Sequence, residues 1–127
     1  MSESSYLRPL LWIASSKRDF IKMPDDVTDD FGHWLFQVQK GKKPKNAKPL
    51  SGFGGACVLE LVKDHADGTF RTVYTVKFDE IVVVLHAFQK KSKKNIETPK
   101  QDIELIHSRL KLVEVMCKEW KEKKSKK

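Results

Sequence analysis

The chain has 127 residues, of which 39% are hydrophobic and 33% charged, so it can form one packed core and is not a disordered polymer. Its formal net charge of +8 favours a polyanionic partner. No stretch approaches the ~20 consecutive apolar residues that a membrane-spanning helix needs, which argues against a membrane protein of the helical class.

The N-terminal part of the sequence predicts a short strand and two helices. Residues 7–13 favour a strand, which Pro9 confines to a sheet edge or to the strand start. Ser15 or Ser16 can cap a short helix, and a second helix is expected over 24–41. We expect the two helices to be antiparallel and joined by a tight turn. The apolar residues of the second helix repeat at the helical period: Val27, Phe31, Trp34, Leu35 and Val38.

The middle of the chain predicts a loop followed by a three-stranded antiparallel meander. Residues 42–55 contain two prolines and three glycines and indicate a loop. Strands are expected over 56–63, 69–78 and 81–89, because these runs are rich in β-branched and aromatic residues. The Asp-Gly pair at 67–68 is a strong hairpin signal. The third strand is almost continuously apolar, which indicates a central strand covered by helices.

The end of the sequence predicts a C-terminal helix. Thr98 can cap it, with Pro99 at its first position and Gln101 as the partner in a capping box. One face is apolar, formed by Ile103, Ile106, Leu110, Val113, Cys117 and Trp120. The whole pattern predicts an α+β fold, with two N-terminal helices packed on an antiparallel β-sheet and a C-terminal helix after it. We expect a single domain over 1–120 and a lysine-rich disordered tail over 121–127.

Positive charge is concentrated in three segments. Residues 40–48 carry five lysines and no acid, 90–94 carry four lysines, and 118–127 carry six lysines against two glutamates. Such runs are typical of nucleic-acid-binding proteins, because each neutralised phosphate releases a counterion. A solvated surface with a ragged lysine tail is the alternative, and it suits the tail taken alone. Three clusters in one small domain favour a nucleic acid.

The sequence lacks the motifs of several classes of enzyme and of metal-binding sites. The glycine-rich segment 51–55 lacks the lysine and the following Ser or Thr of a P-loop. There is no GxSxG elbow and no cluster of histidines and carboxylates at metal-ligand spacing. Cys57 and Cys117 do not have zinc-ligand spacing and indicate reduced cysteines of a cytoplasmic protein. We therefore expect neither a metal nor a small-molecule cofactor.

A cationic group of residues remains as the candidate site. Strand alternation places Arg71, Thr75 and Lys77 on one side of the sheet. His86 lies near the end of an apolar strand, where a lone histidine is more often a core residue than a catalyst. The residues that follow favour function, because Phe88 and the lysines of 90–94 combine a stacking surface, phosphate-binding charge and a titratable imidazole.

The segment LHAFQKKSKKNIETP, residues 85–99, resembles the LHxFxKKxxKTP motif of the HigB-like, phage-derived branch of the RelE/ParE toxin superfamily. Three upstream pieces match in order: residues 48–52 resemble the KPLxG loop, 59–61 the ELR strand and 70–74 the YRVxY strand. The resemblance covers about residues 7–118, which is nearly the whole chain.

The resemblance implies a small α+β toxin of a type II toxin–antitoxin pair. Such toxins cut mRNA, usually in the ribosomal A site, and their fold is two helices packed on an antiparallel sheet with a C-terminal helix. The implied partners are a cognate antitoxin with a helix-turn-helix DNA-binding domain, mRNA and the ribosome. No membrane and no cofactor is implied, and the protein would act in the cytoplasm.

Residue by residue, the resemblance implies a catalytic set. Arg71 matches the arginine of YRVxY and is a candidate for phosphate binding. The positions of HxFxKKxxK are matched by His86, Lys90, Lys91 and Lys93. The lysine clusters and the neighbouring aromatic residue supply the predicted RNA-binding side chains Lys42, Lys43, Lys45, Lys48, Phe88 and Lys94.

The sequence also departs from the family pattern. Val62 replaces the arginine of ELR, no tyrosine follows Tyr74, and 95–97 replaces the lysine before Thr98. Two alternatives therefore stay open: a ParE-like toxin that poisons DNA gyrase without cutting, and a non-catalytic nucleic-acid-binding protein or degenerate toxin. For a nuclease, His86 is the candidate general acid or base, since an unperturbed histidine titrates near pH ~6.5. If it is buried, a lysine with a lowered pKa or the ribosome must move the proton.

Overall fold

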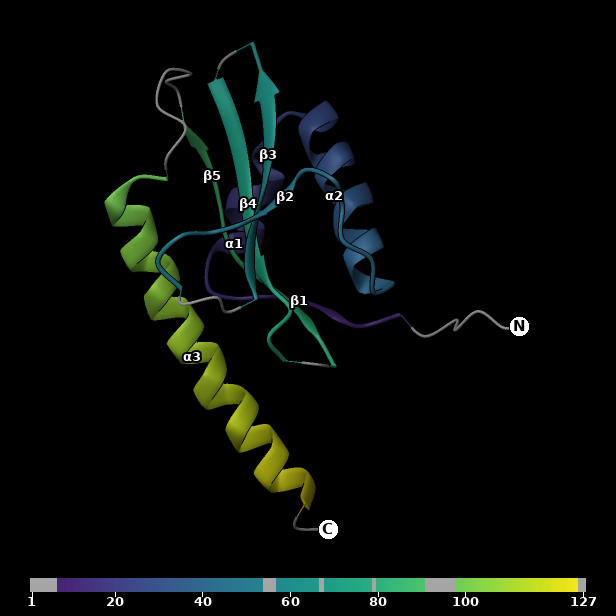
Figure 1. Ribbon diagram of the computed structural model, residues 1–127, viewed down its shortest axis with the longest axis vertical. Helices are drawn as coiled ribbons and strands as arrows, with labels where there is room; N and C mark the ends of the chain where they lie inside the picture. The colour runs from purple at the N-terminus through teal and green to yellow at the C-terminus, as the bar shows by residue number, and fades with distance from the viewer. Residues whose placement is uncertain (1–6, 54–56, 67, 79, 91–97, 126–127) are drawn as a thin grey trace, which may run out of the picture.

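The computed structural model describes residues 7–53, 57–66, 68–78, 80–90 and 98–125. Its elements in chain order are β1 (Leu10–Trp12), α1 (Ser16–Ile21), α2 (Asp25–Gln39), β2 (Ala47–Pro49), β3 (Val58–His65), β4 (Gly68–Thr75), β5 (Val82–Lys90) and α3 (Lys100–Ser125). The sheet forms a central layer, with α2 on one side of it and α3 on the other (Figure 1). The predicted α+β fold is confirmed.

The five strands form one sheet in the order β1-β5-β4-β3-β2. The pairs of β5 with β4 and of β4 with β3 are antiparallel, as predicted. The strand β2 pairs with β3 in an antiparallel sense as well, whereas β1 pairs with β5 in parallel. The sheet is therefore mixed, because α1 and α2 carry the chain away from β1 and a long crossover permits a parallel neighbour. The strand predicted near Pro9 does lie on an edge, and β5 is an interior strand as expected.

The short strand β2 differs from the sequence prediction, which placed its residues in the loop over 42–55. Ala47 pairs with Leu61, and Pro49 pairs with Leu59. Only three residues pair, and proline is tolerated because β2 is the other edge of the sheet. Strand periodicity is not visible over so short a run.

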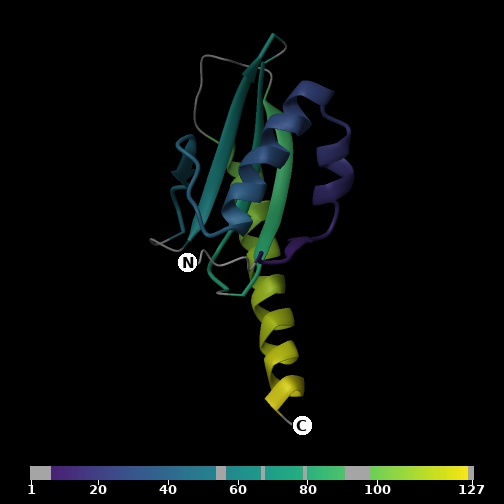
Figure 2. The ribbon, with the colours of Figure 1, turned by 90° about the vertical axis from the view of Figure 1, so that its right-hand side faces the viewer.

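The helices α1 and α2 cover one face of the sheet and run in opposite directions across it (Figure 2). Pro24 is the residue before the helix rather than its first position, and α2 begins at Asp25. Gly41 has a φ of +89° just after α2, a conformation that glycine adopts without strain. The predicted tight turn between two antiparallel helices is confirmed.

Two hydrophobic clusters hold the layers together, one on each face of the sheet. The cluster under α1 and α2 includes Phe31, Leu35 and Tyr74, whereas the cluster under α3 includes Val73 and Leu85. Burial of each such side chain contributes roughly 1.5–3 kcal/mol. The strand β4 is buried along its whole length, and the side chains of its neighbours Val73 and Tyr74 enter opposite clusters, so the predicted alternation is confirmed.

The helix α3 is longer than the sequence predicts. It begins at Lys100 rather than Pro99, and it continues to Ser125, so residues 121–125 of the expected disordered tail are helical, while 126–127 lie outside the described residues. Its first half packs on the sheet, and its last turns project beyond it (Figures 1 and 2). Within the described ranges, no helix is both long and apolar enough to cross a membrane.

Candidate functional site

A β-bulge in β5 places two consecutive side chains on the α3 face of the sheet. Val73 of β4 pairs with His86, but the next residue, Tyr74, pairs with Val84, so Leu85 has no opposite residue. Leu85 packs under α3, while Val84 packs under α1 and α2. Regular alternation after Leu85 would send His86 to the α1 and α2 face. The bulge therefore turns the imidazole toward α3.

An arginine of α3 holds this bulge. Arg109 Nη1 donates to the carbonyl oxygen of Leu85 at 2.8 Å, and its Nη2 donates to Ser15 Oγ at 3.0 Å. The Ser15 hydroxyl in turn donates to Asp19 Oδ2 at 2.9 Å, and, although Ser15 is the residue before α1, its side chain accepts no capping hydrogen bond from the helix backbone. One guanidinium thus connects α3, the bulge and the start of α1, which fixes the backbone next to His86.

His86 is buried and paired with a carboxylate. Its Nε2 lies 2.7 Å from Oδ1 of Asp102 in the first turn of α3, and only 6% of the residue is exposed. Its ring stacks on Phe88, with centroids 4.6 Å apart and ring planes 18° from parallel. Burial lowers the pKa of His86 below 6.5, although the hydrogen bond and the charge of Asp102 act in the opposite direction.

The hydrogen bond indicates the tautomer of His86. A carboxylate only accepts, so a neutral imidazole donates to Asp102 from Nε2 and keeps its lone pair on Nδ1. Nδ1 is buried and has no hydrogen-bond partner among the described residues. The pair has the geometry of a histidine base that is oriented by a carboxylate, but Nδ1, the nitrogen that would accept a proton, has no access to solvent in this structure.

A second polar cluster lies beside His86 on the same face. Arg71 Nη1 donates to Glu60 Oε1 at 3.1 Å, and Thr98 Oγ1 donates to Glu60 Oε2 at 2.6 Å. Arg71 Nη1 also lies 3.3 Å from Thr98 Oγ1. Arg71 and Glu60 are 3% and 6% exposed, so this is a buried ion pair. The hydroxyl of Thr98, expected at the helix cap, joins the ion pair instead.

Strand register shows how the two clusters are related. Glu60 pairs with Val73 and Val73 with His86, while Val62 pairs with Arg71 and Arg71 with Phe88. Arg71 and His86 are therefore diagonal neighbours on one face, within reach of long side chains. We call Glu60, Arg71, His86, Phe88, Thr98 and Asp102 the polar end of the sheet.

The predicted lysines are placed at different distances from the polar end. Lys48 pairs with Glu60 at the edge of the same row and is exposed. Lys90 is the last residue of β5 and is half-buried. Exposed side chains in the connection between α2 and β2 are Lys42, Lys43 and Lys45. Three of the predicted lysines, Lys91, Lys93 and Lys94, lie outside the described residues.

Sequence reasoning missed the partners that hold the predicted residues. Glu60 interrupts the apolar run of β3, and strand alternation alone would have placed it on a face with Arg71. Asp102 gave a weaker signal, since an acid in the first turn of a helix is ordinarily explained by the helix dipole. In the part of the chain that the structure describes, no three His, Cys, Asp or Glu residues are grouped to hold a metal.

Comparisons with known proteins agree with this architecture. The family described as "Phage derived protein Gp49-like" matches residues 18–111, which is more than half of the chain. No curated protein matches the chain significantly in sequence.

Two solved structures of the Escherichia coli RelE toxin share the fold of this chain. The isolated Escherichia coli RelE toxin is 17% identical with a TM-score of 0.53, over 80% of this chain and 97% of that chain. A free double arginine-to-alanine mutant of E. coli RelE is also 17% identical, with a TM-score of 0.52 over 65% of this chain and 83% of that one. A chain of the RelBE2 toxin–antitoxin complex from Mycobacterium tuberculosis is 17% identical with a TM-score of 0.48, over 72% of this chain and all of that chain (100%).

Proposed function

Because the chain belongs to the phage-derived Gp49-like family and has the fold of RelE, we propose that it is the toxin of a type II toxin–antitoxin pair. The predicted resemblance to the RelE/ParE superfamily is confirmed, while the HigB-like branch stays a prediction. The proposed activity is metal-independent cleavage of mRNA on the ribosome in the cytoplasm. Its proposed partners are mRNA, the ribosome and a helix-turn-helix antitoxin.

One observation supports this proposal most directly. Arg71, His86 and Phe88 lie together at the polar end of the sheet, on β5, which leads to the lysine-rich segment 90–94, and on its neighbour β4. Alternation from Phe88 puts Lys90 on the same face. This arrangement supports a proposal in which the neighbouring lysines bind a phosphate backbone and Phe88 stacks on an unstacked base.

The chemistry needs no metal, because RNA carries its own nucleophile. The 2′-oxygen attacks the neighbouring phosphorus, so a bond from the 2′-oxygen to phosphorus forms and the bond to the 5′-oxygen breaks. A base takes the proton of the 2′-hydroxyl, and an acid gives a proton to the leaving 5′-oxygen. Cationic side chains stabilise the negative charge that develops on the phosphoryl oxygens.

Burial supports a division of roles within the predicted catalytic set. Arg71 and His86 are almost fully covered and each is paired with a carboxylate, so neither is available to a phosphate as described. We assign them as positioning residues that hold the end of β5. Charge stabilisation falls to Lys90, Lys91 and Lys93, and proton transfer falls to one of these lysines or to the ribosome. The RNA backbone contacts are assigned to Lys42, Lys43, Lys45, Lys48 and Lys94, and base stacking to Phe88.

The same burial favours a second candidate function. A protein whose Arg71 and His86 serve only to hold the fold would bind RNA without cutting it. This is the non-catalytic nucleic-acid-binding protein or degenerate toxin. The ParE-like alternative, poisoning of DNA gyrase, predicts a different lesion and is separated by the same experiment.

Inducible expression in bacteria, with growth measurement and primer extension on a translated message, tests the proposal. We expect growth arrest with new 5′ ends that appear only while the message is translated. Lys91→Ala and Lys93→Ala should reduce cleavage, whereas Lys123→Ala, which removes the same charge from the end of α3, should not. Arrest with intact mRNA and damaged DNA would move the assignment to gyrase. Absence of arrest would favour the non-catalytic protein.

A further inference from the structure

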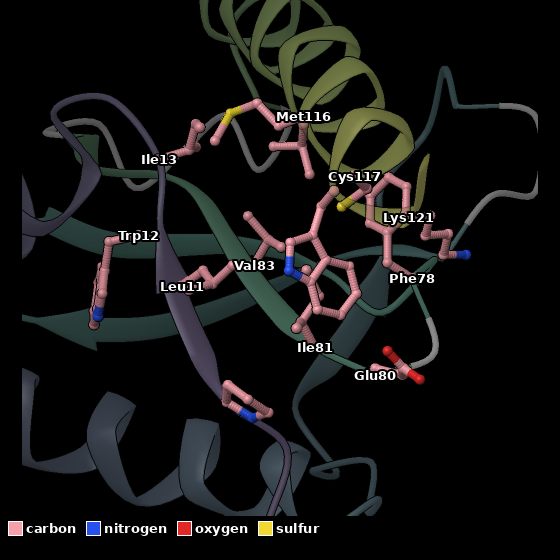
Figure 3. Close-up of a pocket in the computed structure, with 13 residues that line it drawn as sticks. Leu11, Trp12, Ile13, Phe78, Glu80, Ile81, Val83, Met116, Cys117 and Lys121 are labelled. Carbon is pink, nitrogen blue, oxygen red and sulfur yellow. The ribbon is translucent and has the colours of Figure 1, made fainter. Parts of the chain in front are cut away.

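An open apolar groove lies far from the polar end of the sheet. It is formed by β1, the connection between β4 and β5, and the second half of α3, and its volume is about 520 Å³ (Figure 3). Its walls include Leu11 of β1, Ile81 before β5, and Met116 and Cys117 of α3. The groove lies at the start of β5, where Val83 lines it, whereas the polar end extends from His86 in the middle of this strand to Phe88, so the two are separate surfaces.

Large apolar side chains at the groove are exposed to solvent. Leu11 is 46% exposed and Met116 is 49% exposed, although both line the groove. Next to Met116 on the same helix, Leu112 and Val115 are 48% and 56% exposed. Their spacing makes a continuous stripe on α3. A contiguous exposed patch of this kind marks an interaction surface more often than a monomer surface.

Within the described residues, the side chains of this stripe remain about half exposed. The last turns of α3 project past the sheet, and both views show them without a neighbouring element (Figures 1 and 2). The opposite face of the same helix is different, because Ile106, Leu110 and Val113 are packed on the sheet. The helix therefore carries one apolar surface for the core and a second one for an external partner.

The charge around the groove indicates which kind of partner it can bind. Residues 118–127 carry six lysines against two glutamates, and the whole chain has a net charge of +8. A second copy would carry the same net charge of +8 and the same lysine-rich helix end, which disfavours self-association. Glu80 and Lys121 are the charged residues that line the groove, so the charge of the lining is balanced and the positive field comes from the surrounding helix end. This pattern fits an apolar segment that carries excess negative charge.

We propose that the groove between β1 and the second half of α3 binds an acidic amphipathic helix of the cognate antitoxin. A helix suits the site because its i, i+3 and i+4 apolar side chains can lie along the stripe of α3 while its acids face the lysines. The identity of the partner as an antitoxin rests on the proposed function. Binding here leaves α3 in place on the sheet and leaves the polar end uncovered.

The test uses the full chain and the purified protein encoded by the neighbouring gene of its operon as the probe. Met116→Glu places a charge in the groove at a half-exposed helical position, so the fold is expected to persist. We expect this variant to lose at least ~30-fold in affinity by calorimetry, the loss typical of a central interface side chain. Ile21→Glu is the matched control, because Ile21 is 65% exposed on α1 and should leave affinity unchanged.

A second variant tests the charge argument. Lys121→Glu should weaken binding at low salt and lose most of its effect at high salt, because a rim charge acts mainly through long-range attraction. Unfolding midpoints of all three variants, measured by circular dichroism, show whether the fold persists. Equal binding by wild type and Met116→Glu would overturn the proposal, and so would absence of binding by wild type.

Growth assays separate this proposal from the proposed toxicity. If the chain is a toxin, Met116→Glu should arrest growth and escape neutralisation by the co-expressed antitoxin, whereas Ile21→Glu should be neutralised. A chain that causes no arrest but binds the probe through Met116 would refute the toxin assignment and retain the groove. Concentration-dependent dimerisation abolished by Met116→Glu in ultracentrifugation would instead assign the groove to a second copy and overturn the proposal.

Discussion

The Nε2 atom of His86 lies 2.7 Å from Oδ1 of Asp102, and this contact joins β5 to the first turn of α3. The two residues are brought together by a bulge in the strand and by the start of the helix after the lysine-rich segment. The pair therefore depends on the position of the helix, and movement of α3 would change both the environment and the protonation of the imidazole.

Stability should fall in acid because of His86. Burial lowers the pKa of His86 in the folded protein below 6.5, its ordinary value in the unfolded chain. As the pH drops below 6.5, the unfolded state therefore binds more protons than the folded state. The free energy of unfolding is greatest above this pH and declines as the pH falls toward the lower pKa of the folded protein. Urea unfolding across this range should show the decline for wild type and for His33→Gln, an exposed control, but less of it for His86→Gln.

Replacing the partner of His86 should shift its titration further. Asp102 raises the pKa of His86 through its hydrogen bond and charge, against the larger effect of burial. Asp102→Asn should therefore lower the pKa of His86, as measured by NMR titration of the imidazole resonances. Glu104→Gln, at an exposed position of α3 two residues from Asp102, is the control and should leave the pKa of His86 unchanged. A rise of this pKa in Asp102→Asn would contradict the assigned orientation.

The ion pair of Arg71 and Glu60 should show strong energetic coupling. Either Arg71→Ala or Glu60→Ala leaves one buried charge without its partner, which costs roughly 3–5 kcal/mol of unfolding free energy. The double substitution should cost clearly less than the sum of the two single ones. Chemical denaturation of all four proteins measures the coupling. Additive costs would mean that the pair is not formed in solution.

The layers of the fold were predictable because they follow from local patterns. The helical spacing of Phe31 and Leu35 and the alternation of Val73 and Tyr74 indicate which side chains enter the core, and the structure agrees. The parallel pairing of Leu10 with Val82 was not predictable, because no local signal distinguishes it from an antiparallel edge.

The site was less predictable than the fold, because its geometry depends on one irregularity. Regular alternation places Leu85 and His86 on opposite faces, and no residue type in this segment indicates a bulge. The lysine motif indicated where the site lies, but the burial of Arg71 and His86 depends on α3 and on Glu60. Asp102 lies 16 residues from His86, a separation at which only the folded chain reveals a contact.

The bulge should weaken when Arg109 is replaced. Arg109→Met removes the donors to the Leu85 carbonyl and to Ser15 Oγ while keeping an unbranched apolar stem that suits a helix. Leaving a carbonyl without its donor costs ~1–3 kcal/mol, and hydrogen exchange of the amides around Leu85 should accelerate. Ser15→Ala is the matched control, because it removes one of the two bonds and leaves the bulge carbonyl satisfied. Unchanged exchange in Arg109→Met would show that strand pairing alone maintains the bulge.

Salt dependence should identify the lysines that contact RNA. If Lys48 binds a phosphate from the edge of the polar end, Lys48→Ala should weaken binding to an unstructured RNA and reduce the salt slope by about 0.7, the contribution of one phosphate contact on a single strand. Lys22→Ala removes an equal charge beside α1 and should change neither value. Fluorescence titrations over a range of salt concentrations measure both quantities. Equal effects of the two substitutions would indicate that RNA binding depends on net charge alone. RNA would then have no defined binding position along the row of Lys48, Glu60 and His86.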